Sequence, residues 1–204
     1  MFRDRKDAGL RLADALQPFK QENSLVLAIP RGGVEIGFHV ALRLDAPLAM
    51  LVARKLPLPG NPETGFGAVA EDGSTFLIER IAARLGPQLV AQIIRRQRQE
   101  IERRIHTLRR DEPLPPLGGR TVIVLDDGVA MCRTQKVKRI IAAAPVASPS
   151  TADELAEIAD VIIEKPMYFR AVAQVYEDWY DVSDEEVIQI VDEYRRINGQ
   201  TDHY

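Results

Sequence analysis

The fold class is decided by the stretch Val122-Ile123-Val124-Leu125-Asp126-Asp127-Gly128, an apolar run that ends in two carboxylates and a glycine. Such a run is typical of a buried strand in a parallel sheet, where ligands bind beyond the carboxyl ends of the strands. Adjacent carboxylates repel each other and are tolerated where they bind hydroxyls or Mg²⁺, or where one of them caps a helix. We therefore expect Asp126 and Asp127 to contact a ligand or a metal ion, with helix capping as the alternative.

Further short apolar runs on both sides of this stretch also have the character of buried strands, and helical periodicity lies between several of them. The strands are expected at residues 25–29, 48–53, 121–125, 140–144 and 161–163. Helices are expected over residues 7–16 and 34–44, and after capping boxes at 151–154 and 183–186. Strands that alternate with helices predict an α/β fold with a mostly parallel sheet flanked by helices.

About 65 residues between the second and third of these strands interrupt the alternation. They begin with turn-forming residues at 56–63, continue in a long arginine-rich helix over about 87–110, and end in the Pro- and Gly-rich segment 113–119. A connection of this length is too long for a simple crossover. We expect one domain over residues 1–204 with an insertion at about 56–118, where a lid or a partner surface would lie.

The composition excludes several classes of protein. The chain has 204 residues, with 27 Lys+Arg against 30 Asp+Glu, and its net charge of −3 gives little support to a general nucleic-acid binder. Cys132 is the only cysteine, which excludes an intramolecular disulfide and a metal site built from cysteines. No apolar run approaches the ~20 residues of a membrane span, and the charged N-terminus has no signal-peptide character. We therefore expect a soluble cytoplasmic protein that binds neither nucleic acid nor membrane.

A second ligand-type turn follows the first strand, at Pro30-Arg31-Gly32-Gly33. Two glycines allow the backbone to approach a ligand closely, and the free N–H groups at a helix start attract anions. Arg31 adds a charge and a bidentate fork that suits phosphate. The alternative is an ordinary tight turn between a strand and a helix. We expect residues 30–34 to form an anion site that faces residues 126–128 across the carboxyl end of the sheet.

These two motifs and several others occur in order over residues 2 to about 186. Taken together, the motifs resemble those of the type I phosphoribosyltransferases, in particular a stand-alone and poorly characterised branch of that family. The residues that carry the resemblance are Phe2-Arg3-Asp4-Arg5, Ala8-Gly9, Pro30-Arg31-Gly32-Gly33-Val34, Arg54-Lys55, Pro59-Gly60-Asn61-Pro62-Glu63, Gly67-Ala68 and Asp126-Asp127-Gly128. The resemblance implies an α/β core, a flexible loop, and a small C-terminal hood at about 165–198 over the base-binding site. It also implies transfer of ribose 5-phosphate from phosphoribosyl diphosphate (PRPP) to a nitrogen base or amine, with release of diphosphate and Mg²⁺ as cofactor.

The resemblance further implies a role for each candidate residue. Asp126 and Asp127 would be catalytic, because they would hold the ribose hydroxyls in an oxocarbenium-like state and contact Mg²⁺ directly or indirectly. The diphosphate would be bound by Arg31, Gly32, Gly33 and Lys55, and the loop that closes over it would carry Arg103 and Arg104. The alternative for the two loop arginines is a solvated helix face paired with Glu100.

The hood contains an aromatic cluster with two possible roles. Phe169, Tyr176 and Trp179 would stack on a flat base, or else form the core of the hood. The partners that the resemblance implies are PRPP and a small nitrogenous acceptor. A homodimer is a fair expectation for this family.

The loop expected to bind the 5′-phosphate departs from the family pattern. By resemblance, Gly128, Ala130 and Thr134 would contact the phosphate at the start of a helix. Met131 and Cys132 stand where the family has a threonine and a glycine, and they offer neither the hydroxyl nor the close backbone approach. Three functions therefore stay open: an active phosphoribosyltransferase, a degenerate member that binds PRPP or a nucleotide as a regulator, and an Mg²⁺-dependent phosphohydrolase.

The connection that follows Asp126 is unusually short. The strands at 121–125 and 140–144 are expected to be parallel neighbours, and a parallel crossover with its helix needs at least ~10–12 residues. The carboxylate and phosphate loop occupies residues 127–134 and leaves only 135–138 for the return. We expect residues to be missing near 130–133 and, from the resemblance, a strained or cis peptide bond near Arg31-Gly32.

Overall fold

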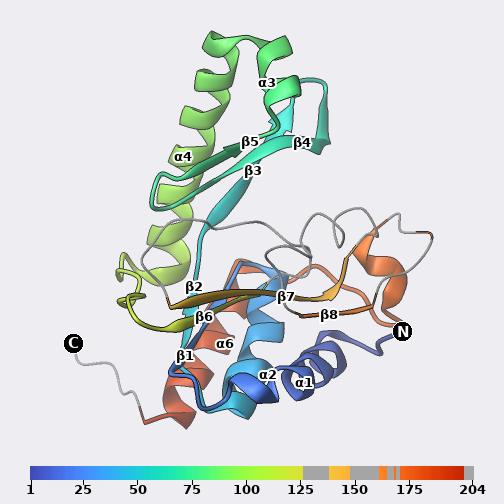
Figure 1. Cartoon of the computed structure of the whole chain (residues 1–204), viewed down its shortest axis with the longest axis vertical. Helices are drawn as coiled ribbons and strands as arrows, with labels where there is room; N and C mark the ends of the chain where they lie inside the picture. The colour runs from blue at the N-terminus through green and yellow to red at the C-terminus, as the bar shows by residue number, and fades with distance from the viewer. Residues whose placement is uncertain (126–137, 148–160, 165–167, 169–170, 200–204) are drawn as a thin grey trace. The chain divides into compact units, whose positions relative to one another are not determined.

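The computed structural model describes residues 1–125, 138–147, 161–164, 168 and 171–199 (Figure 1). The chain divides into two compact units. The described residues of 1–50 and 114–199 form the first unit, and residues 51–113 belong to the second. The second unit begins and ends within a few residues of the insertion that the sequence predicts.

The first unit is built on a five-stranded sheet in the order β2-β1-β6-β7-β8, in which neighbouring strands are parallel. The strands are β1 (Ser24–Ala28), β2 (Leu48–Met50), β6 (Thr121–Leu125), β7 (Arg139–Val146) and β8 (Val161–Glu164). All residues of β1 and β6 are buried, which is why these strands are almost entirely apolar. The expected α/β fold with a mostly parallel sheet is confirmed.

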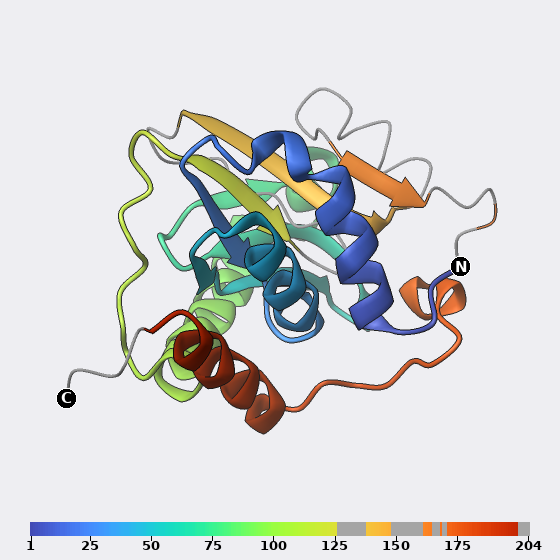
Figure 2. The same cartoon turned by 90° about the horizontal axis from the view of Figure 1, so that it is seen from below.

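Helices α1 (Arg5–Ala15) and α2 (Gly32–Leu44) cover one face of this sheet, and α6 (Asp184–Ile197) packs against α2 (Figure 1, Figure 2). Their apolar sides meet the strands in a core that includes Leu12, Ile36 and Ile123. Two 3₁₀ turns, Gln17–Phe19 (η1) and Val172–Val175 (η2), also belong to this unit. The helices expected over residues 7–16 and 34–44 are confirmed, and each begins two residues earlier than expected.

Local sequence signals explain how two of these helices begin and pack. Gly37 lets α2 approach β1 closely, because a Cβ at this position would lie 2.8 Å from the Cβ of Ala28. Helix α6 begins with the expected capping box: the Ser183 hydroxyl accepts a hydrogen bond from the Glu186 amide at 3.1 Å, and the Glu186 carboxylate accepts one from the Ser183 amide at 2.7 Å. The other expected capping box, at 151–154, lies outside the described residues.

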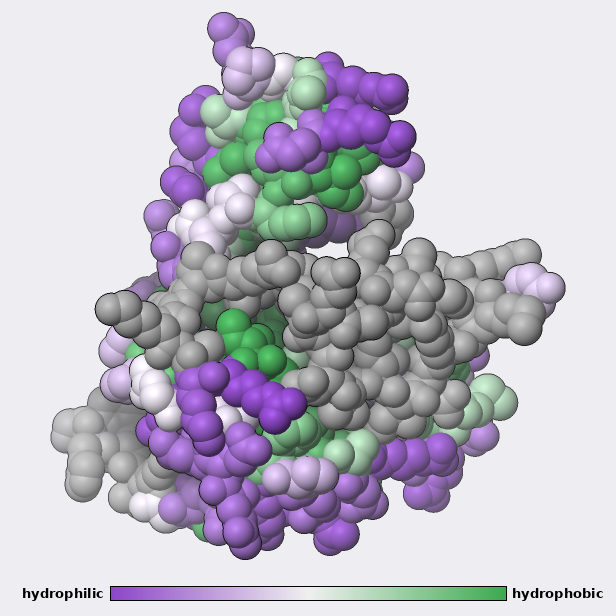
Figure 3. All heavy atoms as spheres, viewed as in Figure 1, coloured by the Kyte–Doolittle hydropathy of each residue, from purple (hydrophilic) through white to green (hydrophobic). Residues whose placement is uncertain are grey.

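The second unit combines a three-stranded antiparallel sheet with two helices. Its elements are β3 (Ala53–Leu58), β4 (Asn61–Ala70), β5 (Thr75–Leu77), α3 (Glu79–Leu85) and α4 (Pro87–Arg109). Leu56, Phe66 and Ile101 belong to its core, and the long helix expected at about 87–110 is confirmed. Apolar side chains are also exposed on this unit (Figure 3), among them Phe76 at 50% and Ile78 at 40%. Among the described helices of both units, none has the length and hydropathy needed to cross a membrane.

The small antiparallel sheet is not predicted from the sequence. The turn-forming residues at 56–63 form the end of the β3–β4 hairpin, where Gly60 has a φ of +81°. Gly67 in β4 serves the close pairing of these strands, because a Cβ there would collide with the carbonyl oxygen of Phe76. The strand expected at 48–53 is wrong as one element, since β2 ends at Met50 and β3 begins at Ala53.

The connection between β6 and β7 falls on residues 126–138. The two strands are parallel neighbours as expected, with Thr121 paired to Arg139. Residues 126–137 lie outside the described part of the chain. The expectation that residues are missing near 130–133 therefore stays a prediction.

Candidate functional site

The strand order creates a topological switch point between β1 and β6. The chain continues from β1 to β2 on one side of this point, and from β6 through β7 to β8 on the other. Ala28 is paired with Leu125, and the amide of Ile29 donates a hydrogen bond to the Leu125 carbonyl at 2.8 Å. Ligands of open parallel sheets bind in the crevice at such a point. The turn at residues 30–34 and the end of β6 at Leu125 therefore lie at the same edge of the sheet.

The turn after β1 leads directly into α2. The peptide bond between Pro30 and Arg31 is cis, next to the position where the resemblance led us to expect it. Arg31 is the N-cap residue, and no side chain of the described residues caps this helix start, so that within this part of the chain its first backbone amides have no side-chain partner. The Arg31 side chain is exposed and makes no hydrogen bond or ion pair with the described residues. An uncapped helix start beside an exposed arginine suits a phosphate or a diphosphate.

Several predicted site residues lie outside the part of the chain that the structure describes. They are Asp126, Asp127, Gly128, Ala130, Thr134 and Phe169. Within the described residues, no group of three or more His, Cys, Asp or Glu side chains could hold a metal ion. Two adjacent carboxylates are oxygen donors of the kind that Mg²⁺ uses together with substrate phosphates. The metal contact of Asp126 and Asp127 stays a prediction.

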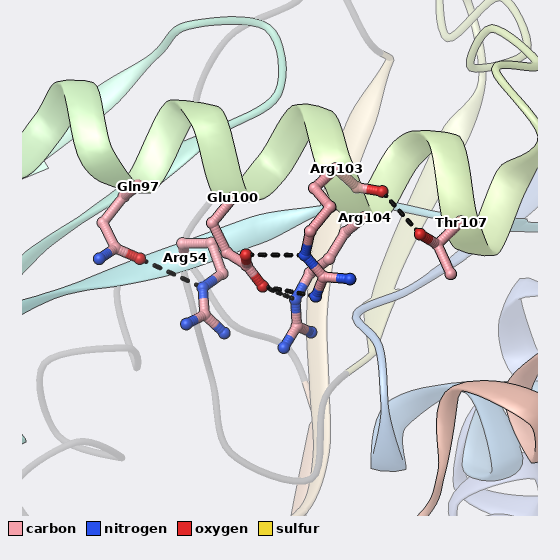
Figure 4. Close-up of polar contacts among 6 residues, drawn as sticks. All are labelled: Arg54, Gln97, Glu100, Arg103, Arg104 and Thr107. Carbon is pink, nitrogen blue, oxygen red and sulfur yellow. Dashed lines mark hydrogen bonds and ion pairs between the residues drawn. The ribbon is translucent and has the colours of Figure 1, made fainter.

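The remaining cationic candidates belong to the second unit. Lys55 lies on β3, and its exposed side chain runs over Gly65 of β4. Arg103 and Arg104 lie on α4 and both donate to Glu100 (Figure 4). Arg103 makes two hydrogen bonds of 2.9 Å, and Arg104 makes one of 3.1 Å through Nε. These contacts agree with the alternative interpretation, in which the two arginines pair with Glu100 on one face of α4. Binding of a diphosphate by Arg103 and Arg104 stays a prediction.

Glu100 is expected to stay ionised at an unusually low pH. The hydrogen bonds from Arg103, reinforced by the one from Arg104, lower the pKa of Glu100 from 4.5 to about 2. Because the folded pKa lies below the unfolded one, the stabilisation from these ion pairs is present above pH 4.5 and is lost as the pH falls toward 2. An NMR titration of the carboxyl carbon should show this, and Arg103→Gln should raise the pKa toward 4.5.

The matched control for this titration is Arg95→Gln. It removes the same charge from the same helix, but Arg95 makes no ion pair with Glu100 among the described contacts. We expect the pKa of Glu100 to be unchanged in this variant. A midpoint near 4.5 in the unaltered protein would contradict the paired geometry.

Two of the predicted hood residues form part of a small aromatic core. Tyr176 is 6% exposed, and its ring centroid lies 5.4 Å from that of Phe2 and 5.1 Å from that of Trp179. The N-terminal residues pair with this segment, since the Phe2 amide donates to the Val175 carbonyl at 2.8 Å. These contacts favour the core interpretation of Tyr176 and Trp179, and base stacking stays a prediction.

A charged cluster that the sequence does not predict lies beside this aromatic core. Arg5 is 2% exposed, its guanidinium lies 4.0 Å from the Trp179 ring centroid, and it donates to the Tyr180 carbonyl at 2.7 Å. The Arg5 guanidinium also lies 3.9 Å from the Glu35 carboxylate, which accepts a hydrogen bond of 2.9 Å from the Tyr180 hydroxyl. Glu35 is in the first turn of α2. The cluster therefore connects the helix start beside Arg31 to α1 and to the segment before α6.

Burial changes the protonation behaviour of this cluster. It raises the pKa of Glu35 above 4.5, although the hydrogen bond from Tyr180 and the charge of Arg5 act in the opposite direction. Burial and the hydrogen bond to Glu35 raise the pKa of Tyr180 to about 12. The phenol therefore remains a hydrogen-bond donor to Glu35 at neutral pH.

The chain is similar to several known proteins. No family model matches it. Two curated proteins of Mycobacterium tuberculosis, "Putative phosphoribosyl transferase Rv0571c" of strain H37Rv and "Putative phosphoribosyl transferase MT0597" of strain CDC 1551, are each 35% identical over 210 residues, which is 96% of this chain and 47% of theirs. This chain thus spans about half the length of these curated relatives.

Solved structures add a relative of similar length. The protein TT1426 from Thermus thermophilus is 37% identical, with a TM-score of 0.77 and coverage of 95% of this chain and 98% of that one. A purine phosphoribosyltransferase from Pyrococcus horikoshii is 13% identical with a TM-score of 0.42, which is too distant to support an assignment.

The strand order and the turn at its switch point define an α/β protein with an anion-type turn at the carboxyl edge of a parallel sheet. The identity to the mycobacterial relatives extends over nearly the whole chain. This likeness agrees with the motifs that resemble the type I phosphoribosyltransferases.

Proposed function

We propose that this protein transfers ribose 5-phosphate from PRPP to the nitrogen of a base or amine. In this reaction a bond forms between the nitrogen and C1 of the ribose, the bond from C1 to the diphosphate oxygen breaks, and the nitrogen loses a proton. The observation that carries the proposal is the pairing of β1 with β6, because both ligand-type segments follow these two strands. The 35% identity to two relatives named putative phosphoribosyl transferases supports the reaction class.

The proposal gives each group a chemical task. The Arg31 guanidinium and the amides at the start of α2 would bind the diphosphate, since such donors stabilise the charge that develops on a leaving group. Asp126 and Asp127 would hold the ribose hydroxyls, where negative charge favours the positive ring. Mg²⁺ would be held by these carboxylates and would supply positive charge to the diphosphate oxygens. Lys55, Arg103 and Arg104 would add cations, and Gly128, Ala130 and Thr134 would contact the 5′-phosphate.

A second candidate function is favoured by Met131 and Cys132. The two residues remove the hydroxyl and the close backbone approach that the family uses for the 5′-phosphate. A protein of this kind would bind PRPP or a nucleotide as a regulator and would show no turnover. Release of inorganic phosphate from a nucleotide with Mg²⁺ and without an acceptor base would instead indicate the phosphohydrolase.

The experiment that tests the proposal measures the melting temperature with Mg²⁺ and PRPP. A ligand at 100 times its Kd stabilises a folded protein by about 2.7 kcal/mol. For a chain of this size, we expect an increase on the order of 5–10 °C. Diphosphate release with a panel of bases and amines then separates the transferase from the regulator.

Two variants on the same helix control for effects on the fold. Arg31→Ala should reduce the PRPP-dependent increase by more than half, because Arg31 lies at the anion-type start of α2. Arg43→Ala should leave the increase unchanged, because Arg43 lies in the last turn of α2 and pairs with Asp14. No PRPP-dependent increase in the unaltered protein would refute both the transferase and the PRPP-binding regulator.

A further inference from the structure

The second unit contains a groove that the proposed function does not use as a whole. It has a volume of about 820 Å³ and is formed by β3, the β3–β4 turn and one side of α4. All of its lining residues lie between positions 54 and 103, inside the second unit. Sites for small molecules have volumes of roughly 300–1,000 Å³, so a nucleotide-sized ligand fits.

The two ends of the groove differ in chemistry. Leu58 and Pro59 of the hairpin, with Leu89 and Ile93 of α4, form the apolar end. Leu89 remains 36% exposed, so its apolar side chain is accessible within the groove. An apolar surface of this kind, with proline at its edge, suits the face of a flat ring.

The other end carries positive charge on a fixed framework. Gln97 of α4 is 8% exposed, and its Oε1 accepts a hydrogen bond of 3.2 Å from Nε of Arg54 on β3, which orients the Arg54 guanidinium (Figure 4). Arg103 and Glu100 also line this end and pair with each other. Arg96 is exposed one turn before Glu100, and it makes no hydrogen bond or ion pair with the described residues. Three arginines against one carboxylate leave this end of the groove cationic.

We propose that the groove between the β3–β4 hairpin and α4 binds a phosphate monoester of a ring-bearing small molecule, the chemistry of a nucleoside monophosphate. The phosphate would lie among Arg54, Arg96 and Arg103, because guanidinium groups bind phosphate through two parallel hydrogen bonds. The ring would lie on the apolar end. This site goes beyond the proposed function, since all of its lining residues belong to the second unit and Arg103 is the one lining residue that the proposed function also names.

A nucleic-acid strand is the competing occupant. Residues 51–113 carry 11 Lys+Arg against 8 Asp+Glu, although the whole chain is acidic. A polyanion would respond to the charge of α4 as a whole and would engage Arg95 as well as Arg96. The groove favours the small molecule, because only Arg96 of this adjacent pair lines it.

Isothermal titration calorimetry of the full chain with AMP tests the proposal. Arg96→Gln should weaken AMP binding about tenfold, because it removes a charge-assisted contact to the phosphate. The matched controls are Arg95→Gln, the neighbouring exposed arginine, and Arg31→Gln at the strand ends. Both controls should bind AMP within about twofold of the unaltered protein, and inorganic phosphate should bind at least about tenfold more weakly than AMP.

Each other outcome overturns the proposal in a distinguishable way. A loss in Arg31→Gln alone would locate AMP at the strand ends, which would leave the proposed function standing. Equal losses in Arg95→Gln and Arg96→Gln, with tighter binding of a short RNA than of AMP, would indicate a nucleic-acid surface. Equal affinity for phosphate and AMP would show that the apolar end does not bind the ring. No binding of AMP would show that the groove is not a site for a nucleoside monophosphate.

Discussion

The double substitution Asp126→Asn and Asp127→Asn is expected to abolish PRPP-dependent release of diphosphate. Asparagine keeps the size of each side chain and removes its charge, so the change acts on the electrostatics of the ribose ring. Preorganised charges of this kind contribute about 10²–10³-fold to rate for each group in enzymes. We therefore expect a loss of at least about 10³-fold in turnover with little change in the fold.

The measurement is continuous detection of diphosphate with saturating PRPP, Mg²⁺ and the acceptor that gives activity. Asp14→Asn is the control, because Asp14 lies on α1 and its side chain is 64% exposed. The melting temperature of the double variant should stay within a few degrees of that of the unaltered protein. Turnover at the unaltered rate in the double variant would show that the two carboxylates do not carry the chemistry.

The core of the first unit could be predicted from the sequence because buried parallel strands have a local signature. Each residue of β6 is buried, and the run Val122-Ile123-Val124-Leu125 shows this without any knowledge of its neighbours. The start of α6 is also a local event, since Ser183 and Glu186 satisfy each other's backbone amides. The start of α6 is therefore predicted accurately, whereas α1 and α2, which are predicted from periodicity alone, begin two residues earlier than expected.

The small antiparallel sheet could not be predicted because its strands contain residues that usually end strands. Pro57 lies in β3, and Gly65 and Gly67 lie in β4. The two glycines are explained only by the pairing of the strands. The Lys55 side chain runs over Gly65, and the backbone of β5 lies against Gly67. Leu51 and Val52 are apolar and lie between β2 and β3, which is why the sequence predicts one strand there.

The candidate site also has one part that the sequence predicts and one part that only the structure identifies. The Arg31 turn follows from its place between an apolar strand and an amphipathic helix, which is a local pattern. The cluster of Arg5, Glu35 and Tyr180 depends on contacts between residues 145 and 175 positions apart. No periodicity or spacing reports such contacts, so only the structure identifies them.

The largest expected effect on stability comes from a buried ion pair in the second unit. Arg109, in the last turn of α4, donates through Nη1 to Oε1 of Glu71 at 2.8 Å, and its Nη2 lies 2.8 Å from Oε2 of the same carboxylate. The two side chains are 9% and 6% exposed. Glu71 follows β4 directly, so the pair joins the end of the small sheet to the end of the helix. Glu71→Ala should destabilise the second unit by about 3–5 kcal/mol, because it leaves a buried guanidinium without its carboxylate.

Hydrogen exchange detected by mass spectrometry measures this loss, with peptides from residues 51–113 compared with peptides from residues 1–50 of the same sample. Glu102→Ala is the matched control: Glu102 lies exposed on α4 and makes no ion pair with the described residues, so its loss should cost less than about 0.5 kcal/mol. The double variant Glu71→Met with Arg109→Met should recover most of the stability, since replacing a whole buried pair by apolar side chains is often neutral. Exchange in Glu71→Ala that equals exchange in Glu102→Ala would mean that the pair does not stabilise the unit. Failure of the double variant to recover would assign the loss to the packing of the side chains rather than to the unpaired charge.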